Sequence, residues 1–228
     1  MIDSLLPLLQ LCDSNFPSGA FSHSFGMETY IQEGTVTDAS TFRMILETYM
    51  KEQLVYTDGL GCRLAYEYLQ EGRLDRIWEL DEELFALSLA RETREGTKRI
   101  GEQMTKLCTV LYAFPVLEAY GQRIREKKCF GHPAVVFALV CHELNISLEG
   151  AISACLYAAV SSLIQNAVRA IPLGQTDGQK ILLHSQTILR ELVPLIEILG
   201  PEDLGRSLPG LEIAQMRHEQ LHVRLFMS

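Results

Sequence analysis

The sequence predicts a single all-helical domain, and three observations support this. Apolar residues recur at helical spacing along most of the 228-residue chain, and no segment alternates apolar and polar residues as a strand does. Gly and Pro residues interrupt the pattern where short connections between helices are expected. A hydrophobic fraction of 47% indicates a substantial buried core, and at this length one large domain accommodates it.

In the first half of the chain, apolar stripes at helical spacing predict a series of helices. A short helix that includes Glu28 and Tyr30 ends at Gly34. The stripes that follow are Phe42, Ile45, Leu46 and Tyr49, then Ile77, Leu80, Leu84 and Leu87, then Ile100, Met104, Leu107 and Leu111. The predicted breaks between helices lie at 34–38, 71–72, 114–115, 131–133, 145–147, 172–174 and 200–201.

Two long helices are predicted in the second half. Residues 151–168 carry no charge but include several small polar side chains, which favours a helix buried in protein over one that spans a membrane. Thr176 and Gln179 have the spacing of a capping box and are expected to start a helix that runs to about Leu199. Pro194 lies inside this helix and is expected to kink it.

Charge and cysteine content exclude several classes of function. The formal net charge of −9 argues against a nucleic-acid surface and against binding to an anionic membrane. The six cysteines lie far apart, mostly in apolar runs, and never form a C-x-x-C pair. Reduced thiols that act as small hydrophobes, in a cytoplasmic protein, are therefore expected. No P-loop motif is present, and no cofactor is predicted.

The stretch 15–28 is too irregular for ordinary core packing and lacks a recognisable catalytic pattern. Pro17 and Gly19 predict a turn, because proline restricts φ and glycine accepts positive φ. The residues after the turn alternate loosely between small side chains and phenylalanines, so that two backbones can approach closely beside aromatic anchors. We call residues 15–28 the opening block.

Two other segments are hard to explain by packing alone. Residues 87–95 end in alternating charges, for which a solvated helical face is one interpretation that stays open. The segment 165–175 ends an apolar helix with amides, Arg169 and a sharp turn. Arg169 in a last helical turn complements the helix dipole, but the same corner also suits a rigid docking surface.

Residues 206–228 are expected to form a C-terminal tail distinct from the helical domain at 1–205. Gly and Pro residues precede the tail, and its end is too apolar to remain in water, as Leu221, Val223, Leu225, Phe226 and Met227 show. Two interpretations stay open. The tail either docks on its own core or folds onto a partner, gaining apolar burial at a cost in conformational entropy.

An enzymatic alternative comes from the same tail. His218, Glu219 and His222 match H-E-x-x-H, the motif that places two imidazoles and a general base at a catalytic zinc. However, none of the six residues after His222 can serve as the third ligand that such a site requires. A metal-dependent hydrolase is therefore the alternative function, and no metal site is predicted. A helical bundle that binds a ligand in a deep apolar pocket is a third possibility.

Four blocks in this order resemble the UreF family of urease accessory proteins. They are the opening block, the Ala-Arg-Glu-Thr-Arg run at 90–94, the segment 166–175, and the ending 213–219 with 224–228. Together they cover nearly the whole chain, and the position of His222 is variable in the family. The residues at 12–15 differ from the smaller or more apolar ones that relatives often have.

The resemblance implies a non-enzymatic, all-helical homodimer that acts as an adaptor or chaperone in urease maturation. It implies two partners, UreD (also called UreH) and the GTPase UreG, in an assembly that delivers nickel to apo-urease. The residues implied on the GTPase side are Phe21, Ser22, Glu28, Arg169, Pro172, Leu173, Gly174 and Gln175. Those implied on the UreD/UreH side are Ile213, Met216, Arg217, His218, Glu219, Arg224, Leu225 and Phe226.

Overall fold

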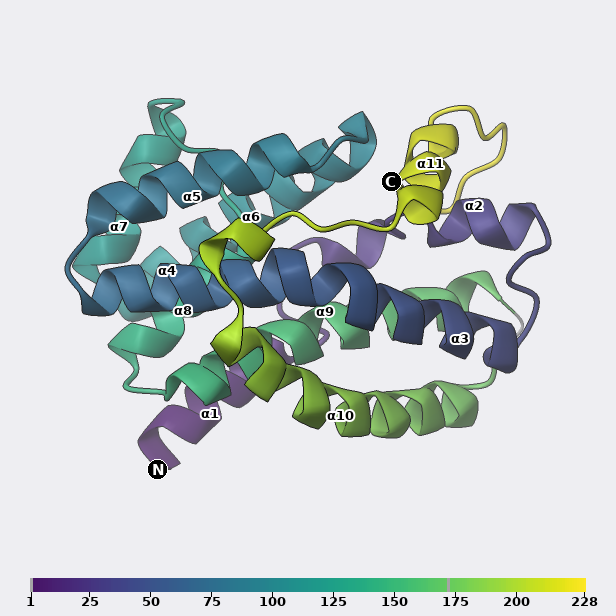
Figure 1. Ribbon diagram of the computed structural model, residues 1–228, viewed down its shortest axis with the longest axis horizontal. Coiled ribbons are helices and arrows are strands. Elements are labelled where there is room, and N and C mark those ends of the chain that lie inside the picture. The colour runs from purple at the N-terminus through teal and green to yellow at the C-terminus, as the bar shows by residue number, and fades with distance from the viewer. Residues whose placement is uncertain (1, 172) are drawn as a thin grey trace.

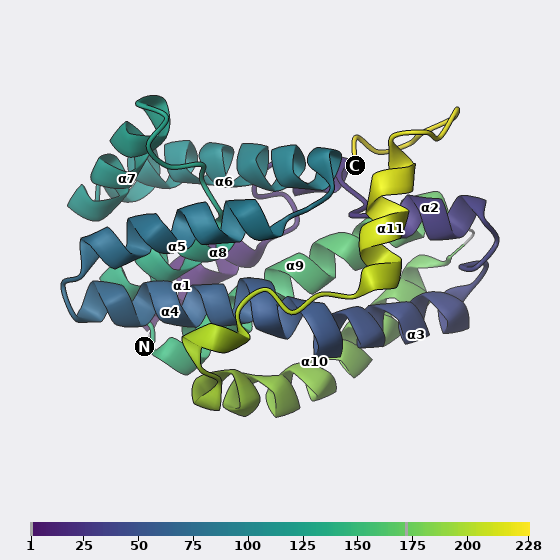
Figure 2. The same cartoon turned by 45° about the horizontal axis from the view of Figure 1, so that its top comes forward.

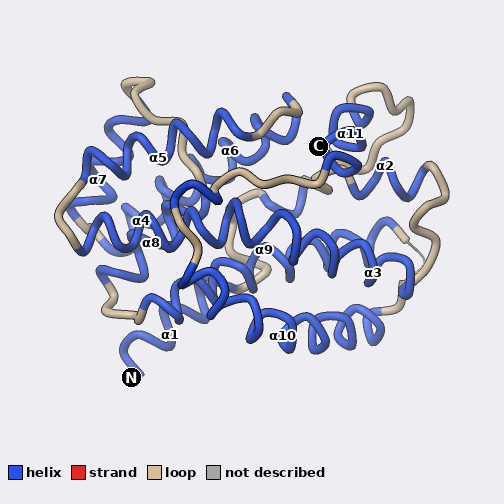
Figure 3. The backbone as a smooth tube through the Cα atoms, in the orientation of Figure 1, coloured by secondary structure: helices blue, strands red, loops and turns tan. Residues whose placement is uncertain are grey.

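The computed structural model describes residues 2–171 and 173–228, and all regular structure within these residues is helical (Figures 1 and 3). The predicted all-helical class is confirmed. The helices are α1 (Ile2–Cys12), α2 (Met27–Gln32), α3 (Ala39–Tyr49), α4 (Leu60–Gln70), α5 (Leu74–Leu87), α6 (Arg91–Tyr112), α7 (Pro115–Arg125), α8 (Pro133–Glu143), α9 (Leu148–Ala170), α10 (Gln175–Ile198) and α11 (Pro209–His218). Two 3₁₀ turns, η1 (Ala20–Ser22) and η3 (Pro201–Asp203), and a π-helical stretch, η2 (Met50–Gly59), complete the fold.

The helix α3 continues through η2 into α4, so that one long rod crosses the molecule (Figure 1). The helix α10 packs along α3 and η2, α5 packs against α4, and α9 contacts both η2 and α4. At one end of the molecule α11 lies beside α2 and the start of α6, as both cartoon views show (Figures 1 and 2). The opening block, the end of α9 and residues 206–228 meet at this end.

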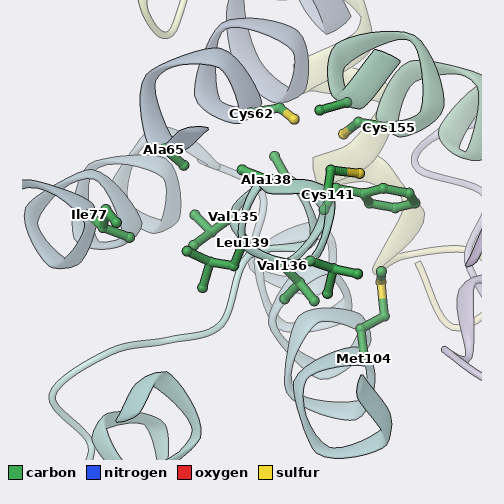
Figure 4. Packing of buried hydrophobic residues seen from close by; sticks show 14 of the residues in the cluster. Cys62, Ala65, Ile77, Met104, Val135, Val136, Ala138, Leu139, Cys141 and Cys155 are labelled. Carbon is green, nitrogen blue, oxygen red and sulfur yellow. The ribbon is translucent and has the colours of Figure 1, made fainter. Parts of the chain in front are cut away.

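The rod and α9 connect two clusters of buried side chains. One cluster lies around α4, α5, α6 and α8, and the other around α3, α9 and α10. The helix α8 is enclosed on every side, because all residues from Ala134 to Cys141 are buried (Figure 4). An all-apolar helix at the centre of a bundle needs no polar face.

The cysteines behave as the sequence predicts. Cys62, Cys141 and Cys155 lie close together inside the first cluster (Figure 4), and all six are unpaired. Burial raises the pKa of Cys12 and that of Cys108 to about 12, so both thiols stay protonated. They contribute to packing and not to nucleophilic chemistry.

Most predicted boundaries are confirmed, and one cap is wrong. Asp38 caps α3 in a capping box with Thr41. The helix α10 begins at Gln175 with Gly174 as its N-cap, and no side chain caps it. The predicted capping box of Thr176 and Gln179 is therefore wrong, because the backbone carbonyl of Gly174 already accepts the N–H groups of residues 177 and 178. The end of α10 is close to the predicted one.

The prediction of burial is confirmed for the long apolar helix but only in part for the third apolar stripe. In α9, an 18-residue window is apolar enough to span a membrane, but 61% of it is buried inside the protein, so the prediction of a core helix is confirmed. In α6, the stripe that begins at Ile100 is only partly buried. Leu111 is 44% exposed, because the end of α6 extends beyond the core.

Replacing Gly101 with alanine should destabilise the fold. A Cβ at Gly101 would lie 2.3 Å from the carbonyl oxygen of Gly131, where α6 crosses the loop before α8. We expect a loss of about 1–3 kcal/mol in the free energy of unfolding, because backbone must move to relieve this overlap. Chemical denaturation measures it. Gly121→Ala on α7 is the control, since the nearest atom there is at 3.5 Å, and it should be neutral or slightly stabilising.

Candidate partner-binding site

The opening block turns sharply and then meets α11. Gly19 and Gly26 both have φ of 87°, a conformation that suits glycine, and Gly26 precedes the first residue of α2. A Cβ on Gly26 would lie 2.8 Å from the Gln215 side chain of α11. Glycine at 26 therefore permits the close approach of two segments far apart in the sequence.

The end of α9 holds the opening block in place. Asn166 donates its side-chain N–H groups to the carbonyl oxygens of Ala20 at 3.2 Å and of His23 at 2.7 Å. Arg169 donates to the carbonyl oxygen of Phe21 at 2.9 Å, and its guanidinium lies over the Phe226 ring at 5.2 Å. The structure thus brings together the opening block and the corner of α9, which the resemblance places on one side.

The last residues of the chain lie on the opening block as well. The Met227 N–H donates to the Ser22 carbonyl at 2.8 Å, and a backbone oxygen of Ser228 accepts from the backbone N–H groups of Ser24 and Phe25 at 2.5 and 3.1 Å. Phe226 and Ser228 are buried in this contact. Of the two interpretations of the tail, docking on its own core is the one that the structure shows. We call residues 219–228 the strap.

A buried cluster of charges fastens the strap and α11 to the body. The two ring nitrogens of His218 face carboxylates, with Nε2 2.9 Å from Glu28 and Nδ1 2.7 Å from Glu92. Glu28 also accepts the backbone N–H groups of Leu225 at 2.6 Å and Phe226 at 3.2 Å. An imidazolium donating both N–H groups satisfies both carboxylates, and every polar atom of the cluster is then paired.

Arg224 closes the cluster from the strap, since its guanidinium donates to Glu92 at 2.8 Å. Burial by itself would raise the pKa of Glu92, but the hydrogen bonds from His218 and Arg224 outweigh it, and the pKa is lowered. Two exposed ion pairs, Arg91 with Glu219 and Arg217 with Glu33, surround the cluster. Exposed pairs of this kind contribute little, typically about 0–1 kcal/mol each.

The structure divides the residues that the resemblance assigns to partners. Glu28, Leu173, His218 and Phe226 are buried within the chain, and Ser22 is half-buried. Those with exposed surface are Phe21, Arg169, Gly174, Gln175, Ile213, Met216, Arg217, Glu219, Arg224 and Leu225. Pro172 lies outside the described residues. The buried members hold this end of the molecule together, and the exposed ones form its rim.

Sequence reasoning missed the part played by Glu92. This residue lies in the run 90–94, for which a solvated helical face was left open. Its side chain is only 19% exposed and receives both His218 and Arg224. Thr29 was also missed, and its hydroxyl donates to the Ala214 carbonyl at 2.8 Å. The sequence feature that could have indicated the role of Glu92 is the Ala-Arg-Glu-Thr-Arg run, because packing alone does not explain the charges in it.

The geometry opposes the zinc-hydrolase alternative. The helix α11 ends at His218, so His222 lies beyond it and does not share its face. Both nitrogens of His218 are engaged by Glu28 and Glu92, which leaves no lone pair for a metal. Within residues 2–171 and 173–228, no group of three or more His, Cys, Asp or Glu side chains is arranged to hold a metal ion.

A cavity of about 220 Å³ lies between the opening block, η2, α6 and α9. Its wall mixes apolar side chains such as Met104 and Phe137 with polar ones such as Asp58 and His132. Burial raises the pKa of Glu212, another wall residue, and one of its carboxylate oxygens has no hydrogen-bond partner among the residues that the structure describes. The cavity is thus not the uniformly apolar pocket that the ligand-binding alternative expects.

The chain is all-helical, and the opening block, the end of α9 and residues 206–228 hold one another in place. Their exposed side chains form a rim at this end of the molecule. These are features of an accessory protein that acts by binding other proteins. The family model described as UreF matches residues 36–186. The chain is 55% identical over 227 residues to the urease accessory protein UreF of Bacillus sp. (strain TB-90), with both chains covered in full. It is 50% identical over 228 residues to that of Lachnoclostridium phytofermentans, again in full, and 52% identical over 224 residues, with 98% of each covered, to that of Geobacillus kaustophilus.

The chain therefore belongs to the UreF family of urease accessory proteins. It is a non-catalytic accessory protein of urease maturation. The resemblance noted in the sequence is confirmed, and the hydrolase alternative is set aside by both the family and the geometry.

Proposed function

We propose that this protein is the adaptor of a cytoplasmic urease maturation complex, in which it binds UreD/UreH and UreG as a homodimer and promotes nickel insertion into apo-urease. The main observation in support of this proposal is that three segments far apart in the sequence meet at one end of the molecule. The opening block, the corner of α9 and residues 206–228 lie side by side and hold each other through buried contacts. A prearranged surface of this kind loses little conformational entropy on binding.

We assign the exposed rim to two neighbouring contacts. Phe21, Arg169 and Gln175 would face the GTPase, because they surround the opening block at the end of α9. The exposed faces of α11 and the strap, with Ile213, Met216 and Leu225, would face UreD/UreH. Apolar side chains and arginines of this kind are the usual anchors of protein interfaces. Residues 206–228 would then be a partner-binding segment that is already folded.

Replacing Met216 with glutamate should abolish capture of UreD/UreH while leaving the fold intact. The side chain is 44% exposed on α11, so a charge is tolerated in the free protein but becomes desolvated in an apolar contact. We expect at least a tenfold loss of affinity in a pull-down or calorimetric titration, and a matching loss of urease activation on co-expression with the other accessory proteins.

Val110→Glu is the matched control, because Val110 is a more exposed apolar residue at the far end of α6. It should bind UreD/UreH normally. Unchanged binding by the Met216 variant would remove α11 from the proposed interface, and equal losses in both variants would show that the effect is unspecific. Light scattering of the unmodified protein tests the proposed dimer.

A further inference from the structure

The cavity between the opening block, η2, α6 and α9 is large enough to hold a small organic molecule. Its volume is about 220 Å³, whereas a cavity of roughly 150 Å³ already accommodates benzene in a protein interior. Its wall includes the exposed residues Asp13, Ser14 and Phe21, which places its mouth beside the opening block. Close-packed cores contain few voids larger than a water molecule, so this cavity is an unusual feature of the fold.

The inner wall carries carboxylates that lack a cationic partner. Glu212 of α11 is only 7% exposed, and no described residue forms an ion pair with it or donates a hydrogen bond to its Oε2. Asp58 of η2 accepts the Thr57 hydroxyl at 3.1 Å, which is a neutral donor. Burial raises the pKa of the Tyr49 phenol well above its usual range, and the charges of Asp58 and Glu212 add to this effect, so both lie within electrostatic range of the same hydroxyl. An unpaired carboxylate in the interior is costly, and a cation removes that cost.

The cationic side chains of the wall are already engaged. Among the described wall residues, Arg169 is the one lysine or arginine, and its guanidinium donates to the Phe21 carbonyl and lies over the Phe226 ring. The wall histidine, His132, accepts the Ala134 N–H at its Nδ1, which requires that nitrogen to be unprotonated. The described part of the wall therefore offers acceptors for a cation, while its own cationic groups are held by other partners.

Aromatic and aliphatic side chains complete the wall. Phe16, Phe25 and Phe137 line it together with Met104. The faces of aromatic rings attract organic cations, and apolar side chains bind a hydrocarbon body. A metal ion fits less well, because in the part of the chain that the structure describes no group of three or more His, Cys, Asp or Glu side chains is arranged to hold one.

We propose that the cavity binds a small organic molecule that carries a primary ammonium group on an apolar body. The ammonium lies between Asp58 and Glu212, beside the Tyr49 ring. The apolar body packs against Met104 and Phe137. The three N–H groups of an ammonium supply the charged donors that the two carboxylates lack. Tyr49 precedes η2 and Asp58 belongs to it, and π-helical segments are frequent at functional sites. This binding activity goes beyond the adaptor function proposed above and does not depend on it.

Titration with benzylammonium tests the proposal. Ligand-observed NMR on the unmodified protein at neutral pH compares this probe with benzyl alcohol, which has nearly the same shape but no charge, and with benzoate, which has the opposite charge. We expect benzylammonium to bind about tenfold more tightly than benzyl alcohol, because hydrogen bonds to charged groups are the stronger ones. Benzoate should not bind. Equal affinities for the three probes, or no binding of benzylammonium, would overturn the proposal.

Glu212→Gln identifies the site, because it removes the charge and keeps the volume of the side chain. We expect its affinity for benzylammonium to fall about tenfold and its affinity for benzyl alcohol to stay the same. The variant should fold normally, since it removes a desolvated carboxylate from the interior, and thermal unfolding checks this.

Glu191→Gln is the matched control, because Glu191 is exposed on α10 and does not line the cavity. It should bind benzylammonium as the unmodified protein does. If both variants lost affinity equally, or if Glu212→Gln lost none, the ammonium would not be bound at Glu212 and the proposal would be wrong.

Discussion

Replacing Glu28 with alanine is expected to lower the free energy of unfolding by about 3–5 kcal/mol and to free the strap. The carboxylate is buried and accepts three N–H groups, from His218, Leu225 and Phe226. Its removal leaves an imidazolium paired only with Glu92, and two backbone donors without a partner in the interior. Urea denaturation measures the loss, and hydrogen exchange of the amides at 225 and 226 measures the release.

Glu33→Ala is a close control, because Glu33 follows α2 and forms an exposed ion pair with Arg217. It should cost less than about 1 kcal/mol. A double-mutant cycle of Glu28→Ala with His218→Ala isolates the coupling between the two groups. A loss below 1 kcal/mol for Glu28→Ala, with normal protection of the strap amides, would mean that the charge cluster does not hold the tail.

Replacing Asp81 with alanine is expected to cost about 3 kcal/mol or more, because three donors lose their acceptor inside the first core cluster. Asp81 is fully buried on α5 and accepts the Tyr120 hydroxyl at 2.5 Å and the backbone N–H groups of Phe130 and Gly131 at 2.6 and 3.2 Å. Burial first, and then the charge and hydrogen bond of Asp81, raise the pKa of Tyr120 well above its usual range. The phenol therefore remains a donor.

The measurement is again the denaturation midpoint, here with two companion variants. Asp81→Asn keeps one acceptor oxygen and should lose about half as much. Glu79→Ala lies two residues away and removes only an exposed pair with Arg76, so it should be nearly neutral. If Asp81→Ala were as stable as Glu79→Ala, the carboxylate would not be what anchors the loop before α8.

The partner sites show how far local reasoning reaches. The family resemblance assigns the opening block and residues 169–175 to a GTPase side, and residues after 212 to a UreD/UreH side. In the fold, Glu28 of the first set binds His218 and the Phe226 backbone of the second. The two proposed partner surfaces are therefore connected by direct contacts. The residues in contact are about 190 positions apart in the sequence, so local spacing does not predict that they meet.

By itself the sequence determined the helical class, most helix boundaries, the buried character of α9, and the family. These properties depend on periodicity, on Pro and Gly at the breaks, and on runs of neighbouring residues, all of which are local. Only the tertiary structure decided that the tail docks on the opening block, that Glu92 belongs to a buried cluster, and that Glu212 lies in the wall of a cavity. Burial and pairing of a charged side chain depend on what the rest of the chain places around it, and that becomes defined only when distant segments pack.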